Sequence, residues 1–155
     1  MDMQLKKMPE LKIVGLSVKT KNPQEFPKLC PQLWGKVCAR ENDVKKSENF
    51  SLAACFTHKN AEGMEFEYLA GYPVADFAVQ PKDMLARTIP AYEYAVFTHC
   101  GDVMELHKTY DYIYSEGLKK HQLQPVDGFD MEYYGEDFNE SPSSKVYIYV
   151  AVKKL

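Results

Sequence analysis

The two halves of this 155-residue chain repeat one pattern. Asn22 and Asp102 stand 80 residues apart, and each is followed three positions later by a glutamate, which is the capping box that begins many helices. Apolar residues at helical spacing follow both boxes, and a strand-like run then aligns in each half. The aligned pairs are Phe26 with Leu106, Cys30 with Tyr110, Leu33 with Ile113, Trp34 with Tyr114, Phe66 with Val146, Tyr68 with Ile148 and Ala70 with Val150.

This repeat constrains the fold, because one such unit alone cannot bury the apolar face of its strands. Each unit is expected to run strand, helix, strand, strand. The predicted class is therefore α+β, with duplicated βαββ units that share one antiparallel sheet and carry two helices on one face. A single domain spans residues 1–155, with repeat one at about 11–72 and repeat two at about 90–153. The expected strands are residues 12–19, 50–58, 64–72, 91–99, 129–135 and 145–153.

Prolines disturb this pattern at two places. Pro27 and Pro31 each lack a backbone donor, so the first helix is expected to be kinked or to begin near Pro31. Pro73 to Pro90 contains further prolines and is interpreted as a connector between the repeats.

Composition excludes several classes of protein. Hydrophobic residues make up 45% and charged residues 26% of the chain, which is typical of globular proteins and not of disordered or fibrous ones. A net charge of −3 argues against direct binding of nucleic acid. The N-terminus lacks a signal-peptide pattern, and no apolar run is long enough to span a membrane, so a soluble, cytoplasmic protein is expected.

The sequence predicts neither a metal site nor a cofactor. The four cysteines form no CxxC pair and are interpreted as buried free thiols. Strand alternation places Cys55 and His58 on opposite faces, which argues against zinc. There is no glycine-rich phosphate loop.

Glu132 occupies a position where the repeat predicts an apolar core residue. Alternation assigns Leu52, Ala54 and Phe56 to the helix-facing side of the first repeat, and the shift places Glu132 on Leu52 and Tyr134 on Ala54. A carboxylate buried there is costly unless it is paired or its pKa rises, so such a residue is a candidate for function.

Two alternatives stay open for Glu132. A register error of one residue would place it in solvent, with Met131 and Tyr133 inside. A buried glutamate could also be satisfied by a neighbouring lysine or tyrosine. The surrounding acidic run is interpreted as mainly a solvated rim that could attract cations. It comprises Asp127, Asp130, Glu132, Glu136, Asp137 and Glu140.

Several motifs resemble the gyrase-inhibitor-like (GyrI-like) domain, which is also the effector-binding domain of AraC- and MerR-type regulators. They are AYEYAVFTHCGDVMELHKTYDYIYSEGL, FDMEYYGEDF, KVYIYVAVKK, the Leu33-Trp34 pair and the strand EFEYLAG. Together they cover nearly the whole chain. Two positions depart from the family pattern, because Met131 replaces the usual aromatic residue and Gly117 stands where tryptophan is common.

The resemblance implies a ligand cleft between helices and sheet, in which an acid at the position of Glu132 meets a cationic aromatic ligand. A carboxylate among aromatic rings suits a lipophilic cation, because ring faces attract positive charge. For the aromatic candidates, ordinary packing between helix and sheet remains the alternative. The candidate ligand-binding residues are Glu132, Tyr134, Trp34, Tyr68, Phe56, Tyr114 and Tyr110.

Three functions are compatible with these residues. The first is sensing or sequestration of a small amphipathic cation. The second is hydrolysis of a reactive small molecule with Glu132 as general base, since some family relatives resemble hydrolases; no set of catalytic residues stands out beside it. The third is a protein-binding module with a macromolecular partner such as gyrase. No helix-turn-helix segment is recognised, so regulation of transcription is expected to require another chain, and the oligomeric state stays open.

Overall fold

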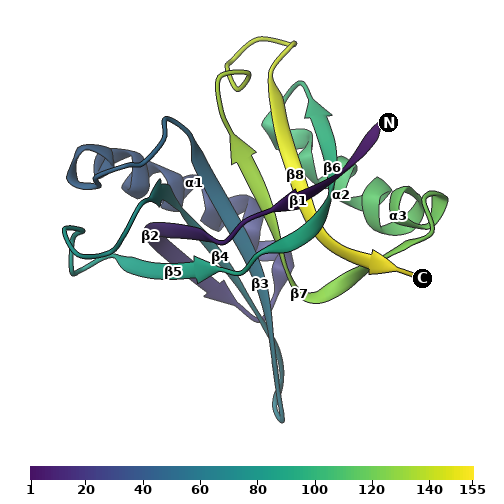
Figure 1. The fold of residues 1–155 in the computed structure, drawn as a ribbon, viewed down its shortest axis with the longest axis horizontal. Helices are drawn as coiled ribbons and strands as arrows, with labels where there is room; N and C mark the ends of the chain where they lie inside the picture. The colour runs from purple at the N-terminus through teal and green to yellow at the C-terminus, as the bar shows by residue number, and fades with distance from the viewer.

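A single antiparallel sheet of eight strands dominates the computed structural model, which describes all of residues 1–155 except the side chains of residues 127 and 128. The spatial order is β1-β6-β8-β7-β3-β4-β2-β5. The strands are β1 (Met3–Met8), β2 (Leu11–Thr20), β3 (Ser51–Asn60), β4 (Gly63–Val74), β5 (Leu85–Ile89), β6 (Tyr92–Cys100), β7 (Leu123–Tyr134) and β8 (Lys145–Lys154). The α+β class with an antiparallel sheet is thus confirmed (Figure 1).

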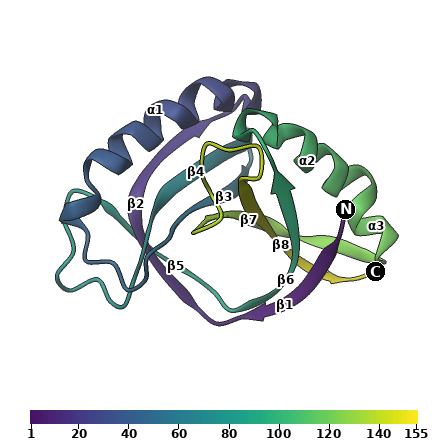
Figure 2. The ribbon, with the colours of Figure 1, turned by 90° about the horizontal axis from the view of Figure 1, so that it is seen from above.

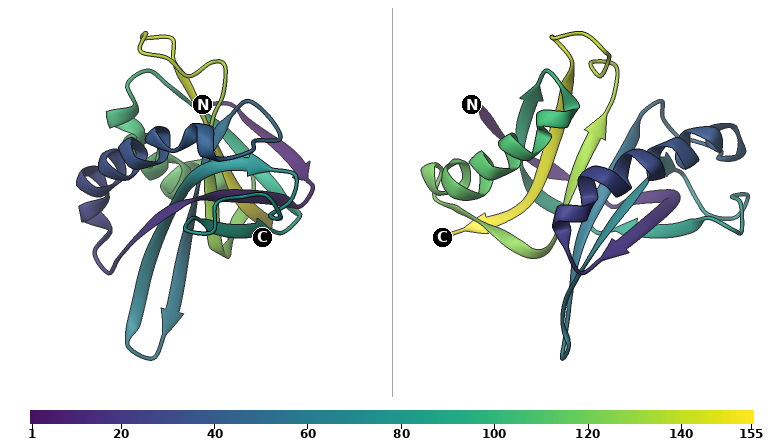
Figure 3. Two further views of the ribbon diagram at one scale, coloured as in Figure 1. Left: turned by 90° about the vertical axis from the view of Figure 1, so that its left-hand side faces the viewer. Right: turned by 180° about the vertical axis from the view of Figure 1, so that it is seen from behind.

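The helices are α1 (Phe26–Ala39), α2 (Leu106–Tyr112) and the short α3 (Leu118–Lys120), and a π-helical turn at Ile113–Gly117 joins the last two. The order β2-α1-β3-β4 recurs as β6-α2-β7-β8. Seen from behind, α1 and α2 lie over the same side of the sheet, one over each half (Figure 3). Among the described residues, no helix is both long and apolar enough to cross a membrane.

Two short strands were not anticipated. β1 precedes β2 but pairs with β6 of the second half, and β5 precedes β6 but pairs with β2 of the first half. Each half therefore contributes one edge strand to the part of the sheet formed by the other half. The interpretation of Pro73 to Pro90 as connector alone is wrong at Leu85–Ile89, because β2 supplies backbone partners that sequence patterns do not reveal.

Both helices begin at the predicted caps. The side chain of Asn22 accepts a hydrogen bond from the backbone N–H of Gln24 at 3.1 Å, and that of Asp102 accepts one from Met104 at 2.9 Å. A single 3-10 turn follows each cap before the α-helix. The start expected near Pro31 is wrong, since α1 begins at Phe26 and contains Pro31, which removes only one intrahelical hydrogen bond near the helix start.

The sheet curves around one core and carries two others beneath the helices. Figure 2 shows the strands wrapping around an interior, with α1 and α2 outside. The interior cluster includes Ile13, Leu69, Tyr94 and Met131, all buried. Separate clusters lie between the sheet and α1, around Leu33 and Val37, and between the sheet and α2, around Ile113.

The predicted parity of the third strand is wrong by one residue. Ala53 pairs with Ala70 on one side and with Glu132 on the other, so Ala53 and Cys55 face the helices. Leu52, Ala54 and Phe56 instead join the interior cluster. Ala53 pairs with Ala70 as Asp130 pairs with Val150, so this strand departs from the 80-residue shift by three residues, and an odd offset exchanges the two faces of a strand.

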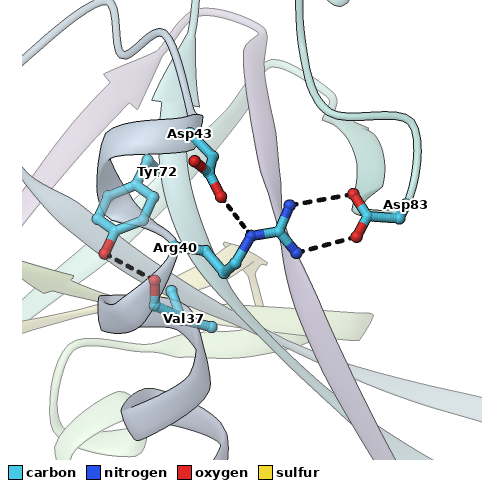
Figure 4. A network of polar contacts seen from close by, with 5 residues as sticks. All are labelled: Val37, Arg40, Asp43, Tyr72 and Asp83. Carbon is cyan, nitrogen blue, oxygen red and sulfur yellow. Dashed lines mark hydrogen bonds and ion pairs between the residues drawn. The ribbon is translucent and has the colours of Figure 1, made fainter.

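The C-terminal end of α1 is fixed by polar contacts (Figure 4). Tyr72 Oη donates a hydrogen bond to the carbonyl oxygen of Val37 at 3.3 Å, which satisfies one of the acceptors left free at a helix end. The guanidinium group of Arg40 bonds to Asp43 and, with two nitrogens, to Asp83 before β5. All four cysteines are free, but the prediction that they are buried is wrong for Cys38 and Cys100, which are exposed, and Cys30 and Cys55 are only partly buried.

Candidate ligand-binding site

Glu132 lies on the helix-facing side of β7, with Ala53 and Ile148 as its neighbours on the adjacent strands. Only 4% of the residue is exposed. The prediction that Glu132 points inward is therefore confirmed, and the alternative that it faces solvent is wrong. Met131 lies on the opposite side, in the interior cluster.

Three tyrosine hydroxyl groups surround the carboxylate of Glu132. Tyr68 and Tyr134 donate to Oε1 at 2.8 and 2.6 Å, and Tyr110 donates to Oε2 at 2.7 Å. These donors come from β4, β7 and α2, so the tertiary fold assembles them. The alternative that tyrosine satisfies a buried glutamate thus describes the hydrogen bonding, but neutral hydroxyl groups leave the negative charge in place.

Glu132 has no cationic partner in direct contact among the described residues. None of the ion pairs between described residues involves Glu132 or its neighbour Asp130. Burial raises the pKa of Glu132, and the hydrogen bonds from Tyr134, Tyr110 and Tyr68 oppose that rise. Burial and then the charge of Glu132 raise the pKa of these three tyrosines well above the usual value, so they remain protonated donors.

Trp34 extends the network on the side of α1. Its indole Nε1 donates to Tyr68 Oη at 2.9 Å, while Tyr68 donates onward to Glu132. The Trp34 ring packs against Tyr134 with centroids 5.2 Å apart and an angle of 71°, and Tyr134 packs against Phe138 at 4.9 Å and 82°. These edge-on contacts form an aromatic wall beside the carboxylate.

Tyr110 and Tyr114 each donate a hydrogen bond to an acid of β7. Tyr110 bonds to Glu132, and Tyr114 Oη donates to Asp130 Oδ2 at 2.7 Å. Four residues of helix rise about 6 Å and two residues of strand about 6.6 Å, so the two pairs are in register along antiparallel elements. Tyr114 lies within the π-helical turn that follows α2, a feature often found at functional sites.

Asp130 was assigned to the solvated rim, and the structure corrects this assignment. Its side chain is half-buried beside Cys55 and Tyr114, and burial followed by the charge of Glu132 raises its pKa to about 6, against hydrogen bonds that lower it. Alternation along β7 could have identified it, since Asp130 and Glu132 share a face. Asp127 of the same predicted rim lies outside the described side chains.

Phe56 is not brought together with the other candidates. It lies in the interior cluster, where the Arg87 guanidinium stands 5.0 Å from its ring centroid and Phe129 lies 6.1 Å away. Six of the seven candidates therefore converge on one side of the sheet. The residues that sequence reasoning missed are Asp130 and Phe138.

Half-exposed aromatic rings separate Glu132 from solvent. Tyr114 is 43% exposed and Phe138 41%, whereas Trp34, Tyr110 and Tyr134 are intermediate. Two surface cavities of about 510 and 210 Å³ lie elsewhere, one beside the C-terminus and one between α1 and β2, and Glu132 lines neither.

Groups suited to nucleophilic catalysis are constrained near this site. The ring nitrogens of His99 are both occupied, with Nε2 donating to the Asp102 carbonyl oxygen at 2.8 Å and Nδ1 bonded to Thr109 Oγ1 at 2.6 Å. Burial and then the charge of Glu132 raise the pKa of Cys30 to about 12, which keeps the thiol neutral. Among the described residues, no three His, Cys, Asp or Glu side chains converge as a metal site would require.

The sheet, the two covering helices and the buried acid define an effector-binding domain of the α+β class. The chain belongs to the family of integron-associated effector binding proteins, Cass2, whose profile matches residues 4–152. The resemblance to effector-binding domains is thereby confirmed.

Known proteins with related sequence or fold agree with this assignment. The transcriptional regulator BrlR of Pseudomonas aeruginosa is 34% identical over 125 residues, which is 78% of this chain; the match spans only 45% of BrlR. The structure of SAV2435 bound to tetraphenylphosphonium superposes with a TM-score of 0.77 at 18% identity, over 99% of this chain and 94% of that one. The structure of EcmrR in complex with DNA superposes with a TM-score of 0.68 at 17% sequence identity, over 99% of this chain and 58% of the EcmrR chain. These two likenesses show a shared fold.

Proposed function

We propose that this domain binds an amphipathic, lipophilic cation at Glu132 and serves to sense or sequester it. The observation that carries the proposal is a carboxylate with 4% exposure that receives three hydroxyl groups and no ion pair from the described residues. A buried charge with neutral partners retains a strong preference for a cation, since the surrounding medium screens it weakly.

The aromatic wall defines the rest of the ligand. Trp34, Tyr134 and Phe138 pack edge to face, and displacement of half-exposed rings would open apolar surface next to the carboxylate. Ring faces contribute about 0.5 to 2 kcal/mol per contact with a cation. SAV2435 is bound to tetraphenylphosphonium, a cation of this kind, which supports the proposal through the shared fold.

A regulatory role in the cytoplasm is part of the same proposal. BrlR is a transcriptional regulator, and the matched segment spans less than half of it, so ligand binding in this domain would control a larger assembly. The likeness to EcmrR, which is solved in complex with DNA, supports the same view, although the net charge of −3 does not favour direct contact of this domain with DNA.

The test is a titration with tetraphenylphosphonium followed through Trp34, the single tryptophan of the chain, with calorimetry as a second readout. Wild type is compared with Glu132→Gln and with Glu136→Gln, which removes an exposed acid from the loop after β7. We expect Glu132→Gln to bind at least about ten-fold more weakly, a loss of about 1.4 kcal/mol, and Glu136→Gln to bind like wild type. Equal affinity of all three proteins would contradict the proposal.

Hydrolysis is a second candidate, favoured by the raised pKa of Glu132, which suits a general base. Its weakness is that both carboxylate oxygens already accept hydroxyl groups, which leaves little access for a water molecule. Incubation with a strained-ring electrophile and mass spectrometry distinguishes the two functions. Water addition that is lost in Glu132→Gln would favour hydrolysis, and an unchanged substrate would favour binding alone.

A further inference from the structure

Asp130 has one carboxylate oxygen that accepts no hydrogen bond from a described residue, whereas both oxygens of Glu132 accept hydrogen bonds. Oδ2 of Asp130 accepts the Tyr114 hydroxyl group at 2.7 Å, whereas Oδ1 is buried and accepts no hydrogen bond of ordinary length and angle from a described residue; the Cys55 thiol and the Tyr110 hydroxyl group lie near enough to lower the pKa of Asp130. Cys55 lies opposite Asp130 on β3, but a thiol is only a weak donor. Both oxygens of Glu132, in contrast, are occupied by tyrosine hydroxyl groups.

The two acids lie close enough to meet one ligand. They are two residues apart on the helix-facing side of β7, which places their side chains about 6 to 7 Å from each other. Neither takes part in an ion pair with a described residue. Tyr114, which bonds to Asp130, is 43% exposed, so Asp130 lies nearer the surface than Glu132.

We infer that Asp130 is a specificity-determining residue of the site. It selects cations that carry N–H groups over fully substituted cations of the same charge. A protonated primary amine on an apolar aromatic body is a cation of the preferred class. An ammonium N–H can donate to Asp130 Oδ1 and satisfy an acceptor that is otherwise buried and unpaired. A quaternary or phosphonium cation has no hydrogen to donate and gains only the attraction of the two charges and the ring faces. This inference rests on the proposed function and adds a ligand class to it.

The contrast between the two acids supports this division of roles. A cation near Glu132 meets a carboxylate already covered by three hydroxyl groups, so the attraction is mainly one of charge. At Asp130 the same cation can form a direct charge-assisted hydrogen bond without displacing a donor. Loss of Glu132 should therefore weaken all cations alike, and loss of Asp130 should weaken mainly those with N–H groups.

The test uses two probes that share one body, 4-phenylbenzylammonium and its N,N,N-trimethyl analogue, with tetraphenylphosphonium as a third cation. Affinities are measured by calorimetry for wild type, Asp130→Asn, Glu132→Gln and Tyr114→Phe. In wild type we expect the primary ammonium to bind at least about five-fold more tightly than the trimethyl analogue, which corresponds to about 1 kcal/mol. Asp130→Asn should bring this ratio close to one, and Glu132→Gln should weaken both probes and keep the ratio.

Tyr114→Phe is a second variant that keeps the inference testable if Asp130→Asn does not fold. It leaves Asp130 in place and frees Oδ2 as a second acceptor, so the preference for the primary ammonium should persist or grow. A ratio near one in wild type, or a ratio that Asp130→Asn leaves unchanged, would overturn the inference. If tetraphenylphosphonium binds and Glu132→Gln weakens it in that case, the proposed function stands. If none of the three cations binds wild type, both proposals are overturned.

Discussion

The hydroxyl group of Tyr110, on α2, donates a 2.7 Å hydrogen bond to Oε2 of Glu132, on β7. This contact joins the second helix to the sheet through a buried charge. Tyr68 and Tyr134 complete the set of donors from the strands. Burial raises the pKa of Glu132, and these three hydroxyl groups oppose the rise; a single substitution can remove each of them.

Replacement of Tyr110 by Phe removes one donor and keeps the ring. Because the lost hydrogen bond stabilises the ionised carboxylate, we expect the pKa of Glu132 to rise further and the free energy of unfolding at neutral pH to fall by about 1 kcal/mol. Titration of the glutamate side-chain carbon signals by NMR measures the first effect and urea unfolding the second. Tyr147→Phe is a matched control, since Tyr147 also donates to a carboxylate, that of exposed Asp137, on the other face of the sheet. An unchanged Glu132 titration in Tyr110→Phe would contradict the role of this donor.

Asp130→Asn should stabilise the protein at alkaline pH more than at acid pH. The pKa of Asp130 rises from 3.8 to about 6 on folding, so its ionisation disfavours the folded state increasingly as the pH rises from 3.8 to 6; the penalty is small near pH 3.8, the unfolded pKa, and complete above pH 6. Two pKa units correspond to at most about 3 kcal/mol, and partial exposure of Asp130 reduces the gain.

Thermal unfolding of wild type and Asp130→Asn at pH 4 and pH 8 measures this difference. Asp76→Asn, at an exposed position in the segment between β4 and β5, controls for the general effect of removing an acid. An equal change in melting temperature at both pH values would contradict the raised pKa of Asp130.

Arg87 should be essential for stability, because its guanidinium group forms hydrogen bonds and an ion pair with a second buried acid, Glu67. Glu67 is 1% exposed and accepts hydrogen bonds from Arg87 at 3.0 and 3.2 Å and from His58 at 2.9 Å. Burial alone would raise its pKa, but hydrogen bonds from Arg87, His58 and Ser17 outweigh it and lower the pKa to about 2. The stabilisation is thus present above pH 4.5 and is lost as the pH falls through 2.

We expect Arg87→Met to reduce the free energy of unfolding by about 3 to 5 kcal/mol at pH 7, since it leaves a buried carboxylate without its cation. Addition of Glu67→Gln should restore part of the loss. Arg40→Met, which breaks the solvent-exposed pairs with Asp43 and Asp83, should cost far less stability than Arg87→Met. Urea unfolding of the four proteins is the measurement, and similar losses for Arg87→Met and Arg40→Met would contradict this distinction.

Gly71 should tolerate no side chain. It lies opposite Gly15 in the pairing of β4 with β2, and a Cβ added at Gly71 would stand 2.2 Å from the backbone oxygen of Val14. We expect Gly71→Ala to destabilise the protein by more than about 3 kcal/mol, because backbone atoms cannot move aside without separating the strands. Gly35→Ala in α1 meets nothing within 4 Å and should stabilise by about 0.5 to 1 kcal/mol. Chemical unfolding of both variants tests the contrast, and a stable Gly71→Ala protein would contradict it.

The local features of the fold were predictable from the sequence. Asn22 and Asp102 cap their helices as expected, since a cap needs only neighbouring residues. The inward position of Glu132 was also predicted, although through an alignment that assigned Leu52 to the wrong face of its strand. Glu132 has the predicted orientation because its own neighbours on β7 alternate correctly, with Met131 on the interior side.

The remaining features depend on pairing between distant segments. Phe56 faces the interior cluster because β3 pairs with β4 and β7 in a register that the repeat did not define. The short strands β1 and β5 exist because the opposite halves offer them open edges, which no local pattern records. Asp130 joins the group of side chains around Glu132 because Tyr114 reaches it from the π-helical turn.

The sequence by itself determined the duplicated order of elements, the helix starts and the presence of an acid at a position that should be apolar. Periodicity and capping act over a few residues, so they can be recognised without knowledge of the fold. Only the tertiary structure decided which groups meet that acid. Tyr68, Tyr110 and Tyr134 lie 64, 22 and 2 residues from Glu132 along the chain, and strand register together with helix packing brings their hydroxyl groups onto one carboxylate.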